Sequence, residues 1–201
     1  MTDRPGVNWK NKTAVVVGSE KPAAAAIADI LRKDGAEVYT LLGKAEGLQE
    51  EIRRVNGLSG SIDALFCDST VADPGLTATE LRPGIIEEAM QNSAYLCWKS
   101  ARYGVPCMES APGAAIVFIT NNSIRHPTGR NIVSALCATS VESITKNFAS
   151  EVASRDIRIC TVMHDGRCEP EKAAGAAIFL ASDEASYITG TAIEVGEVKE
   201  A

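Results

Sequence analysis

His164 and Cys168 are the side chains whose types and spacing first suggest chemistry, because imidazole nitrogen and thiolate sulfur are common ligands of zinc. They stand as His-x-x-x-Cys, but the chain has only two histidines, and two ligands do not make a metal site. The cysteines are irregularly spaced, form no Cys-x-x-Cys pair and mostly lie in apolar segments. We therefore expect no metal site and no disulfide framework, but buried reduced thiols at Cys67, Cys97, Cys107, Cys137, Cys160 and Cys168.

Runs of β-branched and apolar residues alternate with helical patterns along the sequence. The patterns predict strands at residues 12–18, 37–42, 62–67, 114–120, 157–163 and 191–195. They predict helices at residues 22–34, 45–56, 85–108, 131–154 and 169–182. Strands that alternate with helices are typical of a doubly wound parallel sheet, so we expect an α/β fold of about six strands in a single domain over residues 1–201.

The charge and the composition argue against several classes of partner. Lys and Arg number 20 and Asp and Glu 26, which gives a net charge of -6 without any basic run, so neither a nucleic acid nor a membrane is an expected partner. Charged residues interrupt every apolar run well before 18 residues. Residues 1–6 lead into no signal-type apolar stretch, so we expect a soluble, cytoplasmic protein.

Two expected helices, at residues 85–108 and 131–154, are apolar over more of their circumference than a helix outside a sheet needs. Burial by the chain's own domain is one explanation. We favour the other, an interface with a second subunit, with a further contact near residues 187–195. The predicted interface residues are Ile85, Met90, Tyr95, Trp98, Leu136, Val141, Phe148, Val152, Tyr187 and Ile188.

Three segments resemble the short-chain dehydrogenase/reductase family: GSIDALF (60–66), ESITKNFASEVASRDIRICTV (142–162) and AAGAAIFLASDEASYITGTAIEV (173–195). Family members carry similar phrases in the same order. The resemblance implies a Rossmann-like sheet and dimerisation through a bundle of the two broad apolar helices.

The resemblance also implies a phosphate-binding turn of the form TGxxxGxG, in which glycines let the backbone approach a pyrophosphate. Gly18 matches this turn, but the other two glycine positions hold Pro22 and Ala24, and Glu20 adds a negative charge. At the position implied for the adenosine ribose stand Leu42 and a glycine, neither of which can hydrogen-bond a hydroxyl through its side chain. We therefore expect no cofactor bound by this chain.

The catalytic residues that the resemblance implies are a serine, a tyrosine, a lysine four residues after it, and a helix asparagine. In the family the lysine lowers the pKa of the tyrosine, which acts as general acid and base. This sequence has Ser134 at the tyrosine position, Ala138 at the lysine position and Asn121 at the serine position, with Thr120 and Ser123 as its neighbours. The helix asparagine maps near Met90. None of these side chains exchanges a proton near neutral pH, so we expect no catalytic residue.

Tyr95 and Lys99 form a second Tyr-x-x-x-Lys match, and their spacing places both on one helical face. Such a match is expected by chance at roughly 0.2 per chain of this composition, so it is weak evidence. Both residues also precede the fourth strand, on the wrong helix to face its carboxyl end. We expect no catalytic role for this pair.

Two family segments have no counterpart here. The sequence passes from the helix at 45–56 directly to GSIDALF, where the family has a further helix and strand, so we expect the sheet to lack one edge strand. Only residues 164–170 separate the fifth strand from the next helix, so the substrate lid of the family is also missing.

Three functions fit these observations. The favoured one is a non-catalytic subunit of a heteromeric dehydrogenase, a heterotetramer in which an active paralogous subunit binds NAD and oxidises its substrate, for example a hydroxyacyl-CoA. The second is an enzyme with altered catalytic residues. The third is a stand-alone binding or sensor module, whose ligand would be an amine or a cation at the sheet edge where polar residues gather, namely Glu20, Asp68, Asn121, Asn122 and Asp165.

Overall fold

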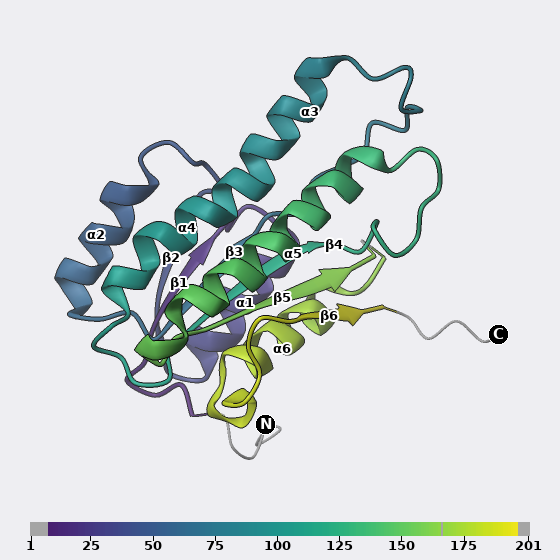
Figure 1. Cartoon of the computed structure of the whole chain (residues 1–201). Coiled ribbons are helices and arrows are strands. Elements are labelled where there is room, and N and C mark those ends of the chain that lie inside the picture. Colours follow the sequence, from purple (N-terminus) through teal and green to yellow (C-terminus); the bar gives the residue numbers. More distant parts are fainter. Residues whose placement is uncertain (1–7, 166, 197–201) are drawn as a thin grey trace.

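The computed structural model describes residues 8–165 and 167–196 and shows one parallel sheet between two layers of helices (Figure 1). Its strands are β1 (Thr13–Val17), β2 (Glu37–Leu41), β3 (Ala64–Asp68), β4 (Ala115–Asn121), β5 (Arg158–His164) and β6 (Ala192–Val195). They are ordered β2-β1-β3-β4-β5-β6, and every neighbouring pair is parallel. The predicted Rossmann-like α/β fold is confirmed.

The helices are α1 (Pro22–Lys33), α2 (Leu48–Ser59), α3 (Pro83–Met90), α4 (Leu96–Gly104), α5 (Ile132–Val152) and α6 (Pro170–Ala181). Three of them start with proline, whose fixed φ and missing N–H suit the first helical turn. The start of α2 was predicted three residues too early, because Gly47 adopts a left-handed conformation directly before the helix.

The helix expected at 85–108 is continuous but not uniform. A π-helical turn at Gln91–Tyr95 separates α3 from α4, and a 3₁₀ turn at Val105–Cys107 ends the run. π-helical turns are rare and occur often beside functional sites. This one lies next to the cleft described below.

Alternate residues of each central strand pack into two separate cores. Helices α2, α4 and α5 cover one face, on side chains such as Leu65 and Phe118, while α1 and α6 cover the other, on side chains such as Phe66 and Val117 (Figure 1). Fully buried strands of this kind read as continuous apolar runs, which is why the sequence predicted them. All six cysteines are buried and free, as expected.

The sheet ends at β2, and the chain then enters α2, which packs against α4, β1 and β2. At the opposite end of the sheet, five residues, 165–169, connect β5 to α6. Among the described residues, no helix is long and apolar enough to cross a membrane.

Candidate functional site

A cleft of about 450 Å³ lies at the carboxyl edge of the sheet, where an open parallel sheet usually binds its ligand. The β1–α1 turn, the end of β2, the loop after β3, and the helices α3 and α5 enclose it. Its lining residues are Glu20, Lys21, Gly43, Lys44, Thr70, Val71, Ala72, Ile85, Glu88, Ala89, Asn92 and Val133.

Gly18 keeps the β1–α1 turn close to β3. Its φ is +83°, and a Cβ there would lie 2.6 Å from the carbonyl oxygen of Asp68, so only glycine fits. Four residues later Pro22 is the first residue of α1 and has no N–H to offer a phosphate, and Ala24 is fully buried. The turn thus keeps the glycine that packing requires but not the two that a pyrophosphate requires.

The Glu20 carboxylate bridges from this turn to the end of β2. Its Oε2 accepts a hydrogen bond from the Gly43 N–H at 3.1 Å, and a Cβ on Gly43 would meet Oε1 at 2.6 Å. Glu20 therefore occupies the space beside Gly43, at the position that the family resemblance assigns to the adenosine ribose. A carboxylate there also repels phosphate groups.

Lys21 makes the second internal contact of the turn. Its ammonium group donates to the carbonyl oxygens of Asp68 at 2.9 Å and Thr70 at 3.0 Å, just beyond β3. Our sequence reasoning did not single out this lysine, and the only signal was its position in the turn after Gly18. Glu20 and Lys21 therefore both bind neighbouring segments in the wall of the cleft.

Asn121, at the family's serine position, binds the loop between β3 and α3. Its Oδ1 accepts a hydrogen bond from the Val71 N–H at 2.9 Å. Ser134, at the tyrosine position, is fully buried, and its hydroxyl donates to the Asp73 carboxylate. The Ser134 N–H donates to Asp73 Oδ1 at 3.0 Å, and the Ser134 and Ser123 hydroxyl oxygens are 2.5 Å apart.

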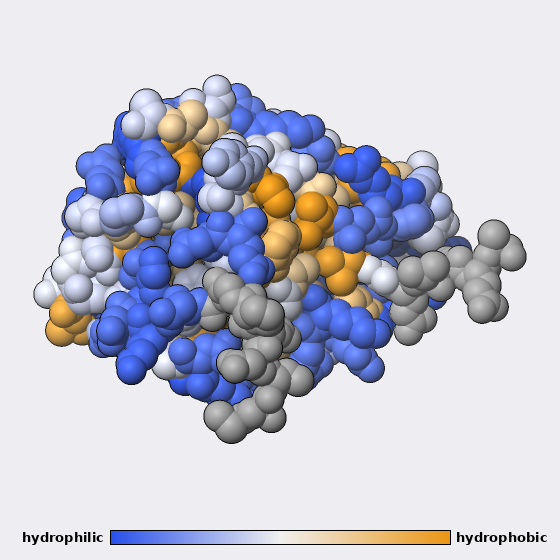
Figure 2. Space-filling view, turned by 90° about the horizontal axis from the view of Figure 1, so that it is seen from below, coloured by the Kyte–Doolittle hydropathy of each residue, from blue (hydrophilic) through white to orange (hydrophobic). Residues whose placement is uncertain are grey.

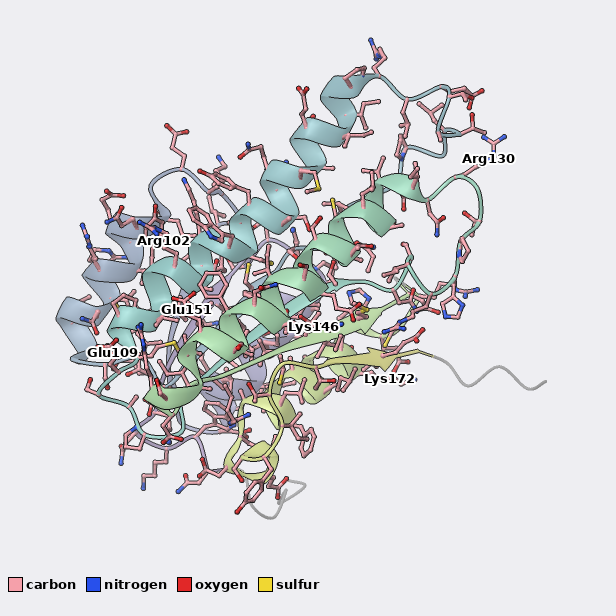
Figure 3. The ribbon with its side chains drawn as sticks, in the orientation of Figure 1. Arg102, Glu109, Arg130, Lys146, Glu151 and Lys172 are labelled. Atoms are coloured by element: carbon pink, nitrogen blue, oxygen red, sulfur yellow. The ribbon has the colours of Figure 1, made fainter. Side chains whose placement is uncertain are left out.

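Arg130 adds a third attachment to the same loop, because its guanidinium donates to the carbonyl oxygen of Gly75 at 2.7 Å (Figure 3). We name residues 71–75 the β3–α3 strap. Asn121, Ser134 and Arg130 together fix the strap between the end of the sheet and the start of α5.

The remaining two family positions hold no group that could transfer a proton. Ala138 is fully buried on α5. Met90 is half-buried, and its sulfur lies 3.9 Å from Cys137 Sγ and 4.0 Å from Ser140 Oγ. Burial raises the pKa of the Cys137 thiol, so this cysteine is no thiolate nucleophile at neutral pH.

Tyr95 ends the π-helical turn, Lys99 lies in α4, and neither is among the residues that line the cleft. The Tyr95 ring is 40% exposed and stacks on Trp98, with ring centroids 5.4 Å apart. The Lys99 ammonium lies 5.0 Å from the centre of the Tyr95 ring and donates to the carbonyl oxygen of Ala45 at 2.8 Å. The structure therefore uses this pair for packing between α4 and the β2–α2 connection.

The polar residues expected to gather for an amine or cation instead bind their own neighbours. Asp68 accepts hydrogen bonds from the Thr70 N–H and hydroxyl, and Asn122 donates to Glu194. Asp165 accepts from the N–H groups of residues 167 and 168. No group of three or more metal-ligating side chains occurs in the described part of the chain.

Asp165 and His164 have shifted pKa values at this edge. Burial acts to raise the pKa of Asp165, but the N–H groups of Arg167 and Cys168 together with the Arg167 charge bring it below its usual value. For His164, burial lowers the pKa, and the nearby charges of Asp68 and Asp165 offset only part of this effect. Burial also raises the pKa of the Cys168 thiol, so His164 and Cys168 do not form an activated pair.

The predicted interface residues fall into three groups. Tyr95, Leu136 and Tyr187 are exposed, the last one completely. Ile85, Met90, Trp98, Phe148 and Ile188 are half-buried. For Val141 and Val152 the prediction was wrong, because both are on the inner side of α5 and are fully buried in the chain's own core.

No family model matches the chain. It is 25% identical over 241 residues to "Dehydrogenase/reductase SDR family member 4" of Sus scrofa, covering 93% of this chain and 86% of the relative. It is 27% identical over 212 residues to "7alpha-hydroxysteroid dehydrogenase" of Clostridium sardiniense, covering 88% and 79%.

Solved structures show the same fold. The short-chain dehydrogenase/reductase from Serratia marcescens BCRC 10948 superposes with a TM-score of 0.84 at 22% identity, covering 94% of this chain and 97% of that one. Thermoplasma acidophilum aldohexose dehydrogenase in its ligand-free form gives 0.85 at 18% identity, covering 95% and 94%.

The fold and the cleft define a Rossmann-like α/β protein with a cleft at the carboxyl edge of its sheet. The sequence relatives are named as dehydrogenases or reductases, and the structural neighbours show the same fold.

Proposed function

We propose that this chain is a non-catalytic subunit of a heteromeric short-chain dehydrogenase, and that an active paralogous subunit carries NAD and the chemistry. The observation that carries the proposal is the use of Asn121 and Ser134, which stand at two catalytic positions of the family. Both side chains hold the β3–α3 strap.

The cofactor turn supports the same conclusion independently. A dinucleotide would have to displace Glu20 from the Gly43 N–H and place its phosphates beside a carboxylate. It would also meet Pro22 in place of a hydrogen-bond donor. Loss of both the nucleotide turn and the proton-transfer group is expected of a subunit retained for assembly.

The partner would bind on the face formed by α3, α4 and α5. Figure 1 shows these helices side by side on the outside of one sheet face, and Leu136 and Tyr95 supply exposed apolar surface there. Charged side chains also lie on this face, at Arg102, Lys146 and Glu151 (Figure 3). Protein interfaces usually combine apolar anchors with polar residues.

A second contact would form at α6 and β6. Phe179 and Tyr187 are exposed here, and Figure 2, which looks at the molecule from below, shows an apolar patch over this region. Two distinct contact surfaces on one chain fit a heterotetramer.

We further propose that the substrate of the assembly is a hydroxyacyl-CoA. The pattern of lost residues resembles the inactive subunit of the 2-[hydroxy(phenyl)methyl]succinyl-CoA dehydrogenase of anaerobic toluene degradation.

The test is the native mass of the complex that a tagged copy recovers from its own cells. Co-purification of a longer dehydrogenase, of about 250 residues, in fixed stoichiometry and with all NAD binding on that partner supports the proposal. Recovery of this chain without any dehydrogenase overturns it.

An enzyme with altered residues is the second candidate, because the cleft of about 450 Å³ persists and curated relatives are named as dehydrogenases. Calorimetric titration of the isolated chain with NAD(H) and NADP(H) separates the two candidates. Saturable binding in the micromolar range favours the enzyme, and substitution of Tyr95 or Ser134 would then test for catalysis. No saturable binding up to about 1 mM favours the non-catalytic subunit.

A further inference from the structure

The edge strand β2 has main-chain groups that point away from the sheet. The Glu37 N–H donates to the Lys12 carbonyl at 2.9 Å, and the Leu41 carbonyl accepts from the N–H groups of Gly18 and Ser19, so residues 37 and 41 face β1. Because main-chain direction alternates along a strand, the N–H and C=O groups of Val38 and Thr40 face outward. In the described part of the chain, β2 pairs with no strand other than β1.

This edge lacks several of the features that usually prevent strand addition. Natural sheets protect an edge with proline, lysine, a bulge or a covering helix. β2 has the sequence EVYTL, without proline or lysine, and pairs with β1 in an uninterrupted register. Thr40 is exposed, and Leu42, directly after the strand, is 57% exposed. An edge of this kind can accept a further strand through its main chain.

We propose that the β2 edge pairs with the β2 edge of a second copy of this chain, antiparallel about a two-fold axis at Tyr39. In this register Val38 of each copy lies opposite Thr40 of the other. Such a pair exchanges both of its hydrogen bonds, so two pairs satisfy all the outward groups of Val38 and Thr40 with four bonds. The two sheets join into one.

Side chains and charges fit the same axis. Tyr39 is half-buried on the α2 face and would meet its own symmetry mate, and aromatic cross-strand pairs favour antiparallel pairing. Asp34 and Lys44 are both exposed, five residues before and five residues after Tyr39. The two-fold axis therefore places the end of β2 that follows Asp34 beside the end of the other copy's β2 that precedes Lys44, where these unlike charges favour the antiparallel orientation.

This contact does not depend on the proposed function, because β2 is at the opposite end of the sheet from β6 and is not part of α3, α4 or α5. One molecule can therefore bind a paralogue on its helices and a second copy at β2.

Sedimentation velocity of the isolated chain from about 5 µM to about 200 µM tests the proposal, since a contact this small gives a micromolar equilibrium. We expect the mass to rise from the 21.2 kDa monomer toward twice that value. Thr40→Pro removes an outward N–H without touching the bonds to β1, and Thr40→Lys places a charge at the edge. Both variants should remain monomeric, whereas the matched control Thr40→Val should dimerise as the wild type does.

Circular dichroism shows whether each variant is folded, and if Thr40→Pro is not, Thr40→Lys decides. Slowed hydrogen exchange of the Val38 and Thr40 amides at high concentration would support the edge contact directly. A wild type that stays monomeric up to about 200 µM overturns the proposal. So does a dimer that persists in Thr40→Lys and dissociates with Leu136→Lys on α5.

Discussion

The Ser134 hydroxyl donates to the Asp73 carboxylate across 61 residues of sequence and joins the start of α5 to the β3–α3 strap. The residue that the resemblance aligns with the family's catalytic tyrosine is thus a structural donor. Asp73 also accepts a hydrogen bond from the Ser134 N–H, so the main chain and the side chain of Ser134 both bind this carboxylate. This arrangement predicts a loss of stability, rather than a loss of chemistry, when the serine is changed.

Ser134→Ala should lower the free energy of unfolding by about 1–3 kcal/mol, because Asp73 and Ser123 each lose a buried partner. Urea denaturation measures the effect. Ser150→Ala is the matched control on the same helix, since Ser150 is exposed, and it should change stability by less than about 0.5 kcal/mol. Equal effects of the two substitutions would contradict the structural role of Ser134.

The Arg158 side chain caps the carboxyl end of α6. Its guanidinium donates to the carbonyl oxygens of Leu180, Ala181 and Ser182, and it is only 7% exposed. Arg158→Leu leaves these carbonyls without their donor and should cost about 3 kcal/mol or more.

Arg155→Leu provides the comparison for Arg158. Arg155 pairs with Glu109 at 3.0 Å on the surface, where both side chains are largely exposed, so its loss should cost less than about 1 kcal/mol. Thermal or urea unfolding of both variants gives the ranking. A smaller loss for Arg158→Leu than for Arg155→Leu would refute the assignment.

Gly18→Ala should destabilise the fold strongly. Its φ of +83° strains any L side chain, and the new Cβ would lie 2.6 Å from the Asp68 carbonyl oxygen, so we expect a loss of at least about 2 kcal/mol. Gly57→Ala is the control, because Gly57 lies inside α2 with nothing within 4 Å of its Cβ position. That change should stabilise the protein by about 0.5–1 kcal/mol.

Stability should fall on mild acidification because of His164. Burial lowers its folded-state pKa below the ordinary value of 6.5, so the unfolded chain binds the proton more readily. The stabilisation that His164 gives to the folded state is complete above about pH 6.5 and is lost as the pH falls through its folded-state pKa. Urea midpoints between about pH 7.5 and pH 5 measure this, and His164→Gln should flatten the slope. An unchanged slope in that variant would exclude His164 as its source.

Leu136→Lys should break the proposed complex with a paralogous dehydrogenase. Leu136 is 41% exposed on α5, so a lysine there leaves the fold intact while it places a charge at the apolar contact. Leu58→Lys is the control, because Leu58 is 64% exposed on α2, which is not one of the three helices of the proposed contact. Native mass of the recovered complex reports the outcome, and a complex that survives Leu136→Lys but not Leu58→Lys would place the interface elsewhere.

The sequence by itself determined the order and type of the elements, because buried parallel strands read as unbroken apolar runs and glycine or proline marks most helix ends. The family resemblance also predicts that residues such as Ser134 and Pro22 stand where the family has catalytic and cofactor-binding residues. The sequence failed at Val141 and Val152, because an apolar residue on a broad helix looks the same whether its own core or a partner covers it.

Only the tertiary structure decided what the replaced residues do. Glu20 reaches Gly43 across 23 residues, Asn121 binds Val71 across 50, and Lys21 bridges to Asp68 across 47. Such contacts depend on which strands become neighbours, and no local pattern encodes that adjacency. The open edge of β2 is of the same kind, because a strand has a free side only once the order of the whole sheet is fixed.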